Sequence, residues 1–357
     1  WQPFYGVVLG DGESAYKLLE LVDAKQKILE WIQPRFKASP FDGEFDAREK
    51  IDAILLANGH PEAADEDEDA ARREKAAGLE VLFRSRLSVL IGPAGTGKTT
   101  LLEALCNLPS VSNKGVLLLA PTGKASVQLR TKVRRPAATL ASFLVKKRGY
   151  DPDRDIYRQV DPKEAVDAGL VVIDEASMLT EEMLASTLSA LGNVQRLVLV
   201  GDPQQLPPIG AGRPFVDLVN YLRPATFVGS SRVGPSYVEL TVSRRQGGSS
   251  RDDVLLAQWF GDGELGAGAD SVWERLRAGT TSQHLEHRNW RNGDIVGSID
   301  ETLDELIDWD AHEDREIAFK LSYGGTLSKD GKYLNWPTGK GGAGDRSERW
   351  QILSPYR

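Results

Sequence analysis

The nine residues "GPAGTGKTT" (92–100) restrict what this chain can fold into more than any other stretch. They follow the apolar run "LSVLI" (87–91), which has the length of a buried strand, and precede "LLEALCNL" (101–108), whose leucines have helical spacing. The glycines let the backbone turn so that successive N–H groups point inward at the start of a helix. The pattern G-x-x-x-x-G-K-[ST] between a strand and a helix therefore predicts a phosphate-binding loop and a nucleotide site.

Each polar residue of this loop has an expected ligand. Lys98 can reach the β- and γ-phosphates as a point charge, and the Thr99 hydroxyl can ligate Mg²⁺. The residues expected to bind the nucleotide are Gly92, Pro93, Ala94, Gly95, Thr96, Gly97, Lys98, Thr99 and Thr100.

A second stretch, "LVVIDEASML" (170–179), carries two acids at the end of an apolar strand. Ligands of open α/β sheets bind at the carboxyl ends of the strands, so Asp174 is the expected second ligand of Mg²⁺. Glu175 can orient and deprotonate a water for attack on the γ-phosphate. A small-molecule kinase must exclude water from its site, so this acid pair favours hydrolysis of a nucleoside triphosphate.

The stretch "LVLVGDPQQLPPIGAG" (197–212) changes from an apolar strand to a turn that is rich in proline and glutamine. Gln205 offers a neutral amide that can donate and accept hydrogen bonds, so it can sense a γ-phosphate or a water. The prolines that follow stiffen the segment and can transmit a small movement of Gln205. We interpret the segment as a coupling element, with a purely structural turn as the alternative.

The apolar pattern along the chain indicates an α/β fold. Strand-sized runs alternate with helical segments, which predicts a parallel sheet with right-handed crossovers; these runs are 87–91, 116–120, 170–173 and 197–200. Before the sheet, 13–33 and 46–57 have helical spacing, and the acidic run 65–69 is expected in a solvated loop. After residue 246 the chain is rich in glycine and charge, and only 300–309 is expected to form a helix.

Composition sets further limits. The 357 residues carry a net charge of −8, yet residues 124–148 hold eight Lys or Arg and no acid. The lone Cys106 cannot form an internal disulfide and is expected to be a buried thiol. With no signal peptide and no apolar run long enough for a membrane span, we expect a cytoplasmic protein without a membrane partner. The missing N-terminal Met suggests a piece of a longer chain.

Taken together, these stretches resemble the motifs of superfamily 1 helicases, in particular the RecD-like, 5′-to-3′ branch. "GPAGTGKTT" is similar to motif I, "LAPTGKAS" (119–126) to motif Ia, "VVIDEASML" to motif II and "VGDPQQLPPIGAG" to motif III. "LTVSRRQ" (240–246) is similar to motif IV, and the terminal "QILSPYR" resembles the first strand of a second motor domain. "APTGKA" and "GDPQQLPP" are far more specific to this branch than the phosphate-binding loop.

The resemblance implies further roles for matching residues. Motif Ia touches the backbone of single-stranded DNA in the family, which implicates Thr122 and Lys124, and Thr139 is expected to line the same groove. Arg245 stands where the family has an arginine that contacts the γ-phosphate. Where the family reads adenine with a Gln upstream of motif I, this chain offers Lys75, which brings strict ATP preference into question. The basic residues after Lys124, from Arg130 to 135, are either part of the same groove or a solvated helix face.

The fold class implied is a RecA-like P-loop NTPase with a central parallel sheet, preceded by helical elements and followed by a long irregular α+β insertion. We expect a helical region at 1–78, a first motor domain at 79–246 with a small insertion at 131–169, an insertion of unassigned role at 247–345, and the start of a second motor domain at 346–357.

The function implied is an ATP- and Mg²⁺-dependent helicase or translocase on single-stranded DNA, with an RNA track left open. The chain ends before the family's motifs V and VI, so the isolated chain is expected to bind Mg-nucleotide, hydrolyse it poorly and not unwind duplexes. One alternative is a nucleotide-driven switch in defence or regulation that does not unwind. Another is a nucleotide-dependent scaffold that binds a protein partner.

Overall fold

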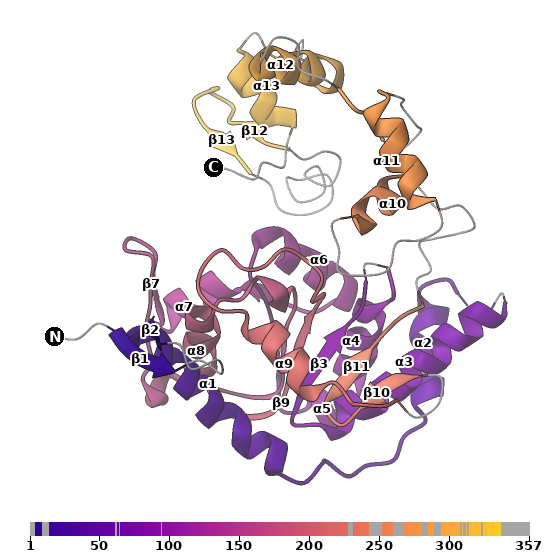
Figure 1. The fold of residues 1–357 in the computed structure, drawn as a ribbon, viewed down its shortest axis with the longest axis vertical. Helices are drawn as coiled ribbons and strands as arrows, with labels where there is room; N and C mark the ends of the chain where they lie inside the picture. The colour runs from indigo at the N-terminus through magenta and orange to yellow at the C-terminus, as the bar shows by residue number, and fades with distance from the viewer. Residues whose placement is uncertain are drawn as a thin grey trace. The chain divides into compact units, whose positions relative to one another are not determined.

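The computed structural model describes residues 4–8, 14–60, 63, 65–93, 95–227, 231–242, 252–259, 268–279, 285–288, 294–307, 309, 312, 314–322 and 324–336. The chain divides into two compact units, Trp1–Ser249 and Ser250–Arg357. The ribbon of Figure 1 labels their helices and strands. No helix in the described ranges combines the length and the apolar character needed to cross a membrane.

A seven-stranded sheet forms the centre of the first unit, and all its strands except the edge strand β10 run parallel to their neighbours. In spatial order the strands are β10 (Arg232–Gly234), β11 (Tyr237–Glu239), β3 (Leu87–Ile91), β9 (Leu191–Gly201), β8 (Val166–Ile173), β4 (Val116–Ala120) and β5 (Ala137–Thr139). The four predicted strands are confirmed, although β8 and β9 begin earlier than their apolar runs. The RecA-like α/β fold class is confirmed as well.

Strand β9 lies between β3 and β8, which fixes where the site can form. Ile91 at the end of β3 pairs with Gly201 of β9, and Ile173 at the end of β8 pairs with Leu199. The carboxyl ends of these three strands therefore lie at one edge of the sheet, directly before the loop at 92–97, Asp174 and the Gln205 segment.

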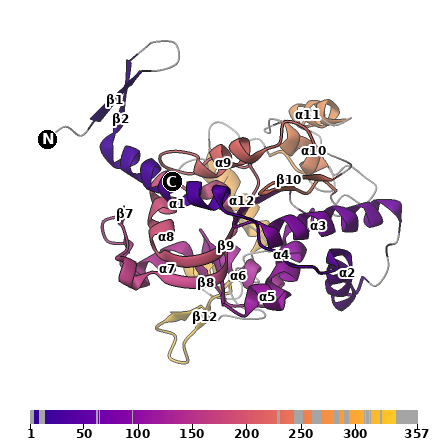
Figure 2. The ribbon, with the colours of Figure 1, turned by 90° about the horizontal axis from the view of Figure 1, so that it is seen from below.

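Alternating side chains of each strand enter two separate cores. In β9, Leu197 and Leu199 pack on one face while Val198 and Val200 pack on the other, as the period of two in a strand requires. One face is covered by α1 (Leu19–Lys37), α7 (Leu140–Lys146), α8 (Glu181–Ser189) and α9 (Pro214–Leu222). The other is covered by α2 (Ala47–Ala57), α3 (Glu66–Arg84), α4 (Lys98–Asn107), α5 (Pro109–Ser112) and α6 (Gly123–Val133). Figure 2 shows α7 and α8 on one side of the strands and α3 and α4 on the other.

Cys106 of α4 is fully buried in the second of these cores. Burial in apolar surroundings raises the pKa of its thiol to about 12. The prediction of a buried structural thiol is confirmed.

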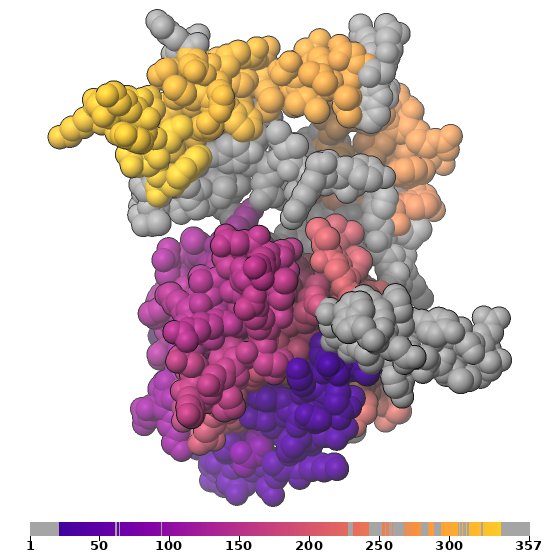
Figure 3. Space-filling view, turned by 90° about the vertical axis from the view of Figure 1, so that its left-hand side faces the viewer, coloured from indigo at the N-terminus to yellow at the C-terminus, as the bar shows by residue number. Residues whose placement is uncertain are grey.

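Helix α1 is shorter at its start than the sequence predicts. Residues 14–18, expected in the helix, form strand β2 (Ser14–Leu18) instead, which pairs antiparallel with β1 (Phe4–Val8). The helical part buries Ala24, Ile28 and Ile32, spaced four residues apart along one stripe. This stripe packs against the core under α8, and Figure 3 shows the indigo surface of the N-terminal segments bordering the magenta surface of the same unit.

The acidic run 65–69 is part of α3, so the expectation of a loop is wrong. Asp65 caps this helix, its side chain accepting from the Glu68 N–H at 2.7 Å, and residues 66–69 supply four acids in the first turn. Negative charge is stabilised there by the unpaired N–H groups and the helix dipole. The predicted helix at 46–57 is confirmed as α2, capped in the same way by Asp46.

Small elements lie between α6 and β8. Strand β5 joins the edge of the main sheet, and the two-stranded hairpin of β6 (Tyr150–Asp151) and β7 (Ile156–Tyr157) stacks Tyr150 on Tyr157 at 4.6 Å between ring centroids. A 3₁₀ turn, η1 (Pro162–Glu164), leads into β8.

The second unit contains α10 (Asp252–Gln258), α11 (Ala269–Arg277), α12 (Ile295–Leu306), α13 (Arg315–Ser322) and the hairpin of β12 (Thr326–Leu327) and β13 (Leu334–Asn335). The helix predicted at 300–309 is confirmed in α12, while α10, α11 and α13 were not predicted. Trp259 stacks on Trp273 at 5.6 Å, and Arg275 pairs with Asp252, so α10 and α11 are held together.

Candidate active site

The loop between β3 and α4 adopts the turn that its glycines allow. Gly92, Gly95 and Gly97 have φ of 149°, 90° and 90°, a region that other residues rarely adopt. At Gly92 a Cβ would also collide with the Leu240 carbonyl oxygen. Gly97 is the N-cap of α4, so Lys98, Thr99 and Thr100 form its first turn, whose unpaired N–H groups favour an anion.

Lys98 lies at the centre of a group of charges. Its ammonium donates to the carbonyl oxygens of Gly92 and Pro93, the second at 3.1 Å. Burial lowers the pKa of Lys98, while the nearby acids Asp202, Asp174 and Glu175 oppose that shift. Asp174, Glu175 and Asp202, which follow β8 and β9, thus lie near enough to Lys98 for their charges to act on it.

Asp174 follows directly after β8, and its own N–H donates to the Leu119 carbonyl at 2.9 Å, which extends the β4–β8 ladder. Burial raises the pKa of its carboxyl to about 6. The hydrogen bond that its Oδ1 accepts from the Glu175 N–H at 2.9 Å lowers the pKa, but by less than burial raises it. A carboxylate oxygen and the Thr99 hydroxyl are hard oxygen ligands of the kind Mg²⁺ prefers. The residues present therefore fit the expected cation.

Glu175 has φ 53° and ψ 39°, the left-handed conformation, immediately before the 3₁₀ turn η2 (Ala176–Met178). Such a conformation costs a residue with a Cβ about 1 kcal/mol or more and tends to occur at functional sites. The turn keeps Glu175 next to Asp174 and in the field of Lys98.

Gln205 is joined to the acid-bearing turn by its side chain. Its Oε1 accepts from the Ser177 hydroxyl at 3.2 Å, and its N–H donates to the Asp202 carbonyl at 3.1 Å. Ser177 lies three residues after Asp174 on η2. A direct hydrogen bond therefore connects the Gln205 segment to the segment that carries both acids, while the rest of Gln205 is exposed.

The residues expected to bind nucleic acid lie at or just after the ends of the next two strands, β4 and β5. Thr122 is the N-cap of α6 and accepts from the Ala125 N–H at 3.2 Å, and Thr139 is the N-cap of α7 and accepts from the Ser142 N–H at 3.1 Å. Lys124 is half-buried in the first turn of α6. These three residues lie at the same edge of the sheet as the phosphate loop, because β4, β5 and β8 are parallel neighbours.

Two residues near the site were not predicted there. Asp202 and Lys132 both act on the charge of Lys98, and Lys132 also acts on Asp174. Asp202 lies directly after the end of β9. The rule that ligands bind at the carboxyl ends of parallel strands would therefore have predicted it near the site. Lys132 lies near the end of α6, and no local pattern in the sequence could have revealed its position.

The basic residues after Lys132 contact other parts of the first unit. Arg134 donates to Asn58 Oδ1 at 2.7 Å and lies 3.8 Å from Glu103, and Arg135 donates to the Cys106 carbonyl at 2.9 Å. Neither is a freely solvated side chain. They join the end of α6 to α4 and to the end of α2.

Lys75 of α3 packs directly on the phosphate loop. Its side chain is buried, and a Cβ on Gly97 would collide with Lys75 Cε. The lysine that the sequence offered upstream of the loop is therefore next to the nucleotide site. Ala94, Arg245 and residues 346–357 lie outside the described residues, so the roles expected for them stay predictions.

Comparison with known proteins identifies a family for this chain. Residues 71–281, more than half of the chain, match the family described as "AAA domain". The chain belongs to this family.

Two curated relatives are similar in sequence to more than half of this chain. The ATP-dependent RecD2 DNA helicase of Deinococcus radiodurans is 31% identical over 207 residues, which are 58% of this chain and 26% of that protein. The RecBCD enzyme subunit RecD of Mycolicibacterium smegmatis is 32% identical over 275 residues, 71% of this chain and 46% of that protein. The resemblance to RecD-like superfamily 1 helicases is confirmed, and the chain spans less than half of the length of these relatives.

Among solved structures, the crystal structure of the Pif1 helicase from Candida albicans aligns with 65% of this chain. The alignment covers 53% of the Pif1 chain, at 19% identity and with a TM-score of 0.37.

Proposed function

We propose that the first unit is a motor domain that hydrolyses ATP with Mg²⁺ and couples hydrolysis to movement on single-stranded DNA. The observation that carries the proposal is that Asp174 and Glu175, directly after β8, act on the charge of Lys98, which follows the parallel strand β3, while Gln205 is hydrogen-bonded to Ser177. The names of the relatives, an ATP-dependent DNA helicase and a RecBCD subunit, support the same function.

In the proposed reaction, Lys98 and the N–H groups of the loop hold the β- and γ-phosphates. Thr99 and Asp174 would hold Mg²⁺, which neutralises the charge of the phosphate oxygens. Glu175 orients a water and takes its proton as the water oxygen bonds to the γ-phosphorus. The bond from that phosphorus to the β–γ bridging oxygen breaks, and ADP and phosphate result.

The Ser177–Gln205 hydrogen bond is the proposed route from hydrolysis to movement. A change at Asp174 or Glu175 on losing the γ-phosphate shifts η2 and, through Ser177, Gln205. The residues that follow, Leu206 and Ile209, are 86% and 94% exposed. We infer that a second motor domain, of which residues 346–357 are the expected start, covers this segment when bound ATP closes the two motor domains on each other. Arg245 would add positive charge at the γ-phosphate.

The DNA path in this proposal runs along the ends of β4 and β5, where Thr122, Lys124 and Thr139 lie. Lys124 would contact phosphate, which gives affinity without reading the bases or the sugar. A single-stranded RNA of the same length is therefore the necessary comparison.

The test is ATP turnover by the full-length protein with and without single-stranded DNA, alongside Lys98→Ala. We expect stimulation of at least about tenfold, lost in the variant because the γ-phosphate loses its cation. If Lys98→Ala leaves ATP turnover unchanged, the site around Lys98 takes no part in the reaction. If neither DNA nor RNA changes ATP turnover, the result favours a nucleotide switch over a translocase.

A further inference from the structure

A cavity of about 370 Å³ lies beside the phosphate loop in the first unit. Gly95, Gly97 and Thr99 line one side of it, so the cavity adjoins the residue that is expected to bind Mg²⁺. Its other walls come from α2, α3 and the last turn of α6. The Lys, Arg, Asp and Glu residues of the lining are three cations and one acid: Lys75, Lys132, Arg134 and Glu103. The charge of the lining therefore favours an anion.

The acid of this cavity is already paired. Glu103 lies 3.8 Å from Arg134, and its Oε2 accepts from Asn58 Nδ2 at 3.3 Å. Arg134 in turn donates to Asn58 Oδ1 at 2.7 Å. Lys75 is only 3% exposed and donates to the Ala71 carbonyl at 3.2 Å. Glu103 and Arg134 therefore offset each other's charge, and Lys75 is bound within its own helix.

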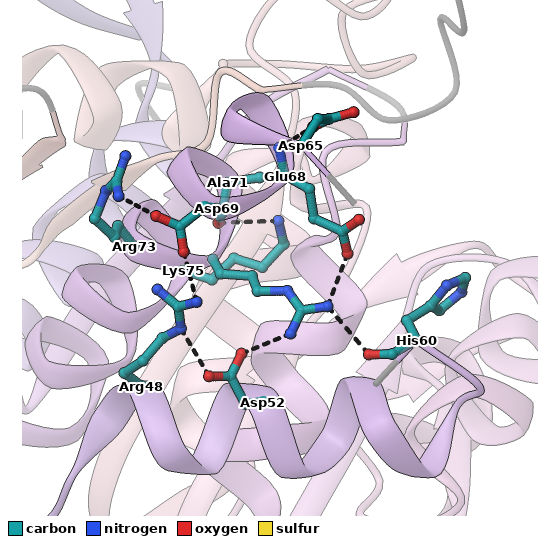
Figure 4. Close-up of polar contacts among 10 residues, drawn as sticks. Arg48, Asp52, His60, Asp65, Glu68, Asp69, Ala71, Arg73 and Lys75 are labelled. Carbon is teal, nitrogen blue, oxygen red and sulfur yellow. Dashed lines mark hydrogen bonds and ion pairs between the residues drawn. The ribbon is translucent and has the colours of Figure 1, made fainter. Parts of the chain in front are cut away.

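The wall made by α2 and α3 is held by ion pairs of its own. Arg72, whose side chain is 3% exposed, pairs with Glu68 at 2.8 Å and with Asp52 of α2 at 2.9 Å. Asp52 also pairs with Arg48 at 2.8 Å, and Figure 4 shows these contacts between the two helices. These carboxylates therefore have cations within α2 and α3. Because breaking a buried ion pair is costly, the network also fixes the shape of this wall.

Lys132 is the cation of this cavity that the protein leaves without a partner. It is exposed in the last turn of α6, and no group in the described part of the chain accepts a hydrogen bond from its ammonium. Its charge nevertheless reaches the site: besides burial, which shifts both pKa values most, the Lys132 ammonium lowers the pKa of Lys98 and of Asp174. Lys98 and Lys132 repel each other, so an anion bound at Lys98 attracts Lys132 in turn.

We propose that Lys132 is a further catalytic residue of the triphosphate site and donates from α6 to the γ-phosphate. The inference rests on the proposed function, since it assumes a triphosphate whose γ-phosphate lies at Lys98. The flexible four-carbon stem of Lys132 can extend toward the phosphate while α6 stays in place. The ammonium keeps its proton and offsets the charge of the γ-phosphate oxygens while the bond to the β–γ bridging oxygen breaks. ADP lacks this phosphate, so Lys132 favours ATP over ADP.

The experiment uses the full-length protein with Mg²⁺ and without nucleic acid. It measures the displacement of one fluorescent nucleotide by a non-hydrolysable ATP analogue and by ADP, together with kcat/KM for ATP. We expect Lys132→Gln to weaken binding of the analogue, and to lower kcat/KM, by about 10- to 100-fold, the range of one hydrogen bond to a charged group, while ADP binds as before. Lys132→Arg, which keeps the charge, should restore most of both. Lys163→Gln, the same substitution on the exposed turn η1, should change neither.

A Lys132→Gln protein with the analogue-to-ADP affinity ratio of the wild type overturns the inference, and because the side chain is exposed this variant should fold. An equal loss of affinity for both nucleotides overturns it too, since ADP has no γ-phosphate to contact. A Lys132→Arg protein as impaired as Lys132→Gln would show that charge is not the cause. If no ATP is hydrolysed, the proposed function fails, but the affinity ratio still decides the role of Lys132. If no nucleotide binds, both proposals fail.

Discussion

Asp174→Asn should make the first unit more stable in buffer without divalent cations, and the gain should depend on pH. Burial raises the pKa of this carboxyl from 3.8 to about 6. The folded-state pKa lies above the unfolded value. The contribution of this carboxyl to the free energy of unfolding is therefore fully present below about pH 4, and it is lost as the pH rises through 6. The ionised carboxylate therefore destabilises the fold at neutral pH, and an isosteric amide removes that cost.

The magnitude follows from the shift. About 2.2 pKa units at 1.36 kcal/mol each give about 3 kcal/mol at pH 7.5, and the same linkage gives about 1.5 kcal/mol at pH 5. The Glu175 N–H can still donate to the amide oxygen of the variant, so the local turn is kept. For a unit of this size, 3 kcal/mol corresponds to an increase in Tm of roughly 6–12 °C.

The assay is thermal unfolding of both proteins in EDTA between pH 5 and 8. Asp153→Asn, which changes an exposed aspartate between β6 and β7, is the matched control and should show no comparable gain. Added Mg²⁺ and nucleotide should stabilise the wild type and not Asp174→Asn. An Asp174→Asn protein no more stable than wild type at pH 7.5, or a gain that does not shrink at pH 5, would refute the reasoning.

Further predictions concern catalysis and packing. Glu175→Gln should bind nucleotide as the wild type does while ATP turnover falls by about two or more orders of magnitude, because the water loses its base; equal turnover would remove Glu175 from that role. Arg72→Ala should lower the free energy of unfolding by about 3–5 kcal/mol in denaturant titrations, because Glu68 is left buried without this cation; a loss below about 1 kcal/mol would contradict the packing of α2 on α3. Cys106 should resist thiol reagents at pH 8 until the protein unfolds, and rapid labelling of the native protein would show that α4 opens.

Local patterns were enough to predict four strands of the sheet and the positions of most candidate site residues relative to those strands. A strand, a glycine-rich turn and a helix follow one another in sequence, so Lys98 and Thr99 could be placed from spacing alone. Asp174 and Gln205 could be placed because parallel strands end at one edge, whatever the details of packing. The prediction for the acidic run 65–69 is wrong because a charge run need not be a solvated loop, and acids at a helix start are stabilised by its N–H groups.

Contacts between distant segments could not be predicted. Lys132 reaches the site only because α6 packs along α4. Asn58 meets Glu103 and Arg134 across 45 and 76 residues of sequence. The helices α10, α11 and α13 lie among glycine-rich segments that dilute the helical pattern. These features depend on tertiary packing, which no single window of the sequence contains.

The most direct measurement of the central claim is a crystal structure of the full-length protein with Mg²⁺ and a non-hydrolysable ATP analogue. We predict the γ-phosphate against Lys98, the cation bound by Thr99 and Asp174, and Gln205 within hydrogen-bond distance of the γ-phosphate or its attacking water. A nucleotide bound elsewhere, or a Gln205 side chain that faces bulk solvent away from the phosphates, would contradict the account.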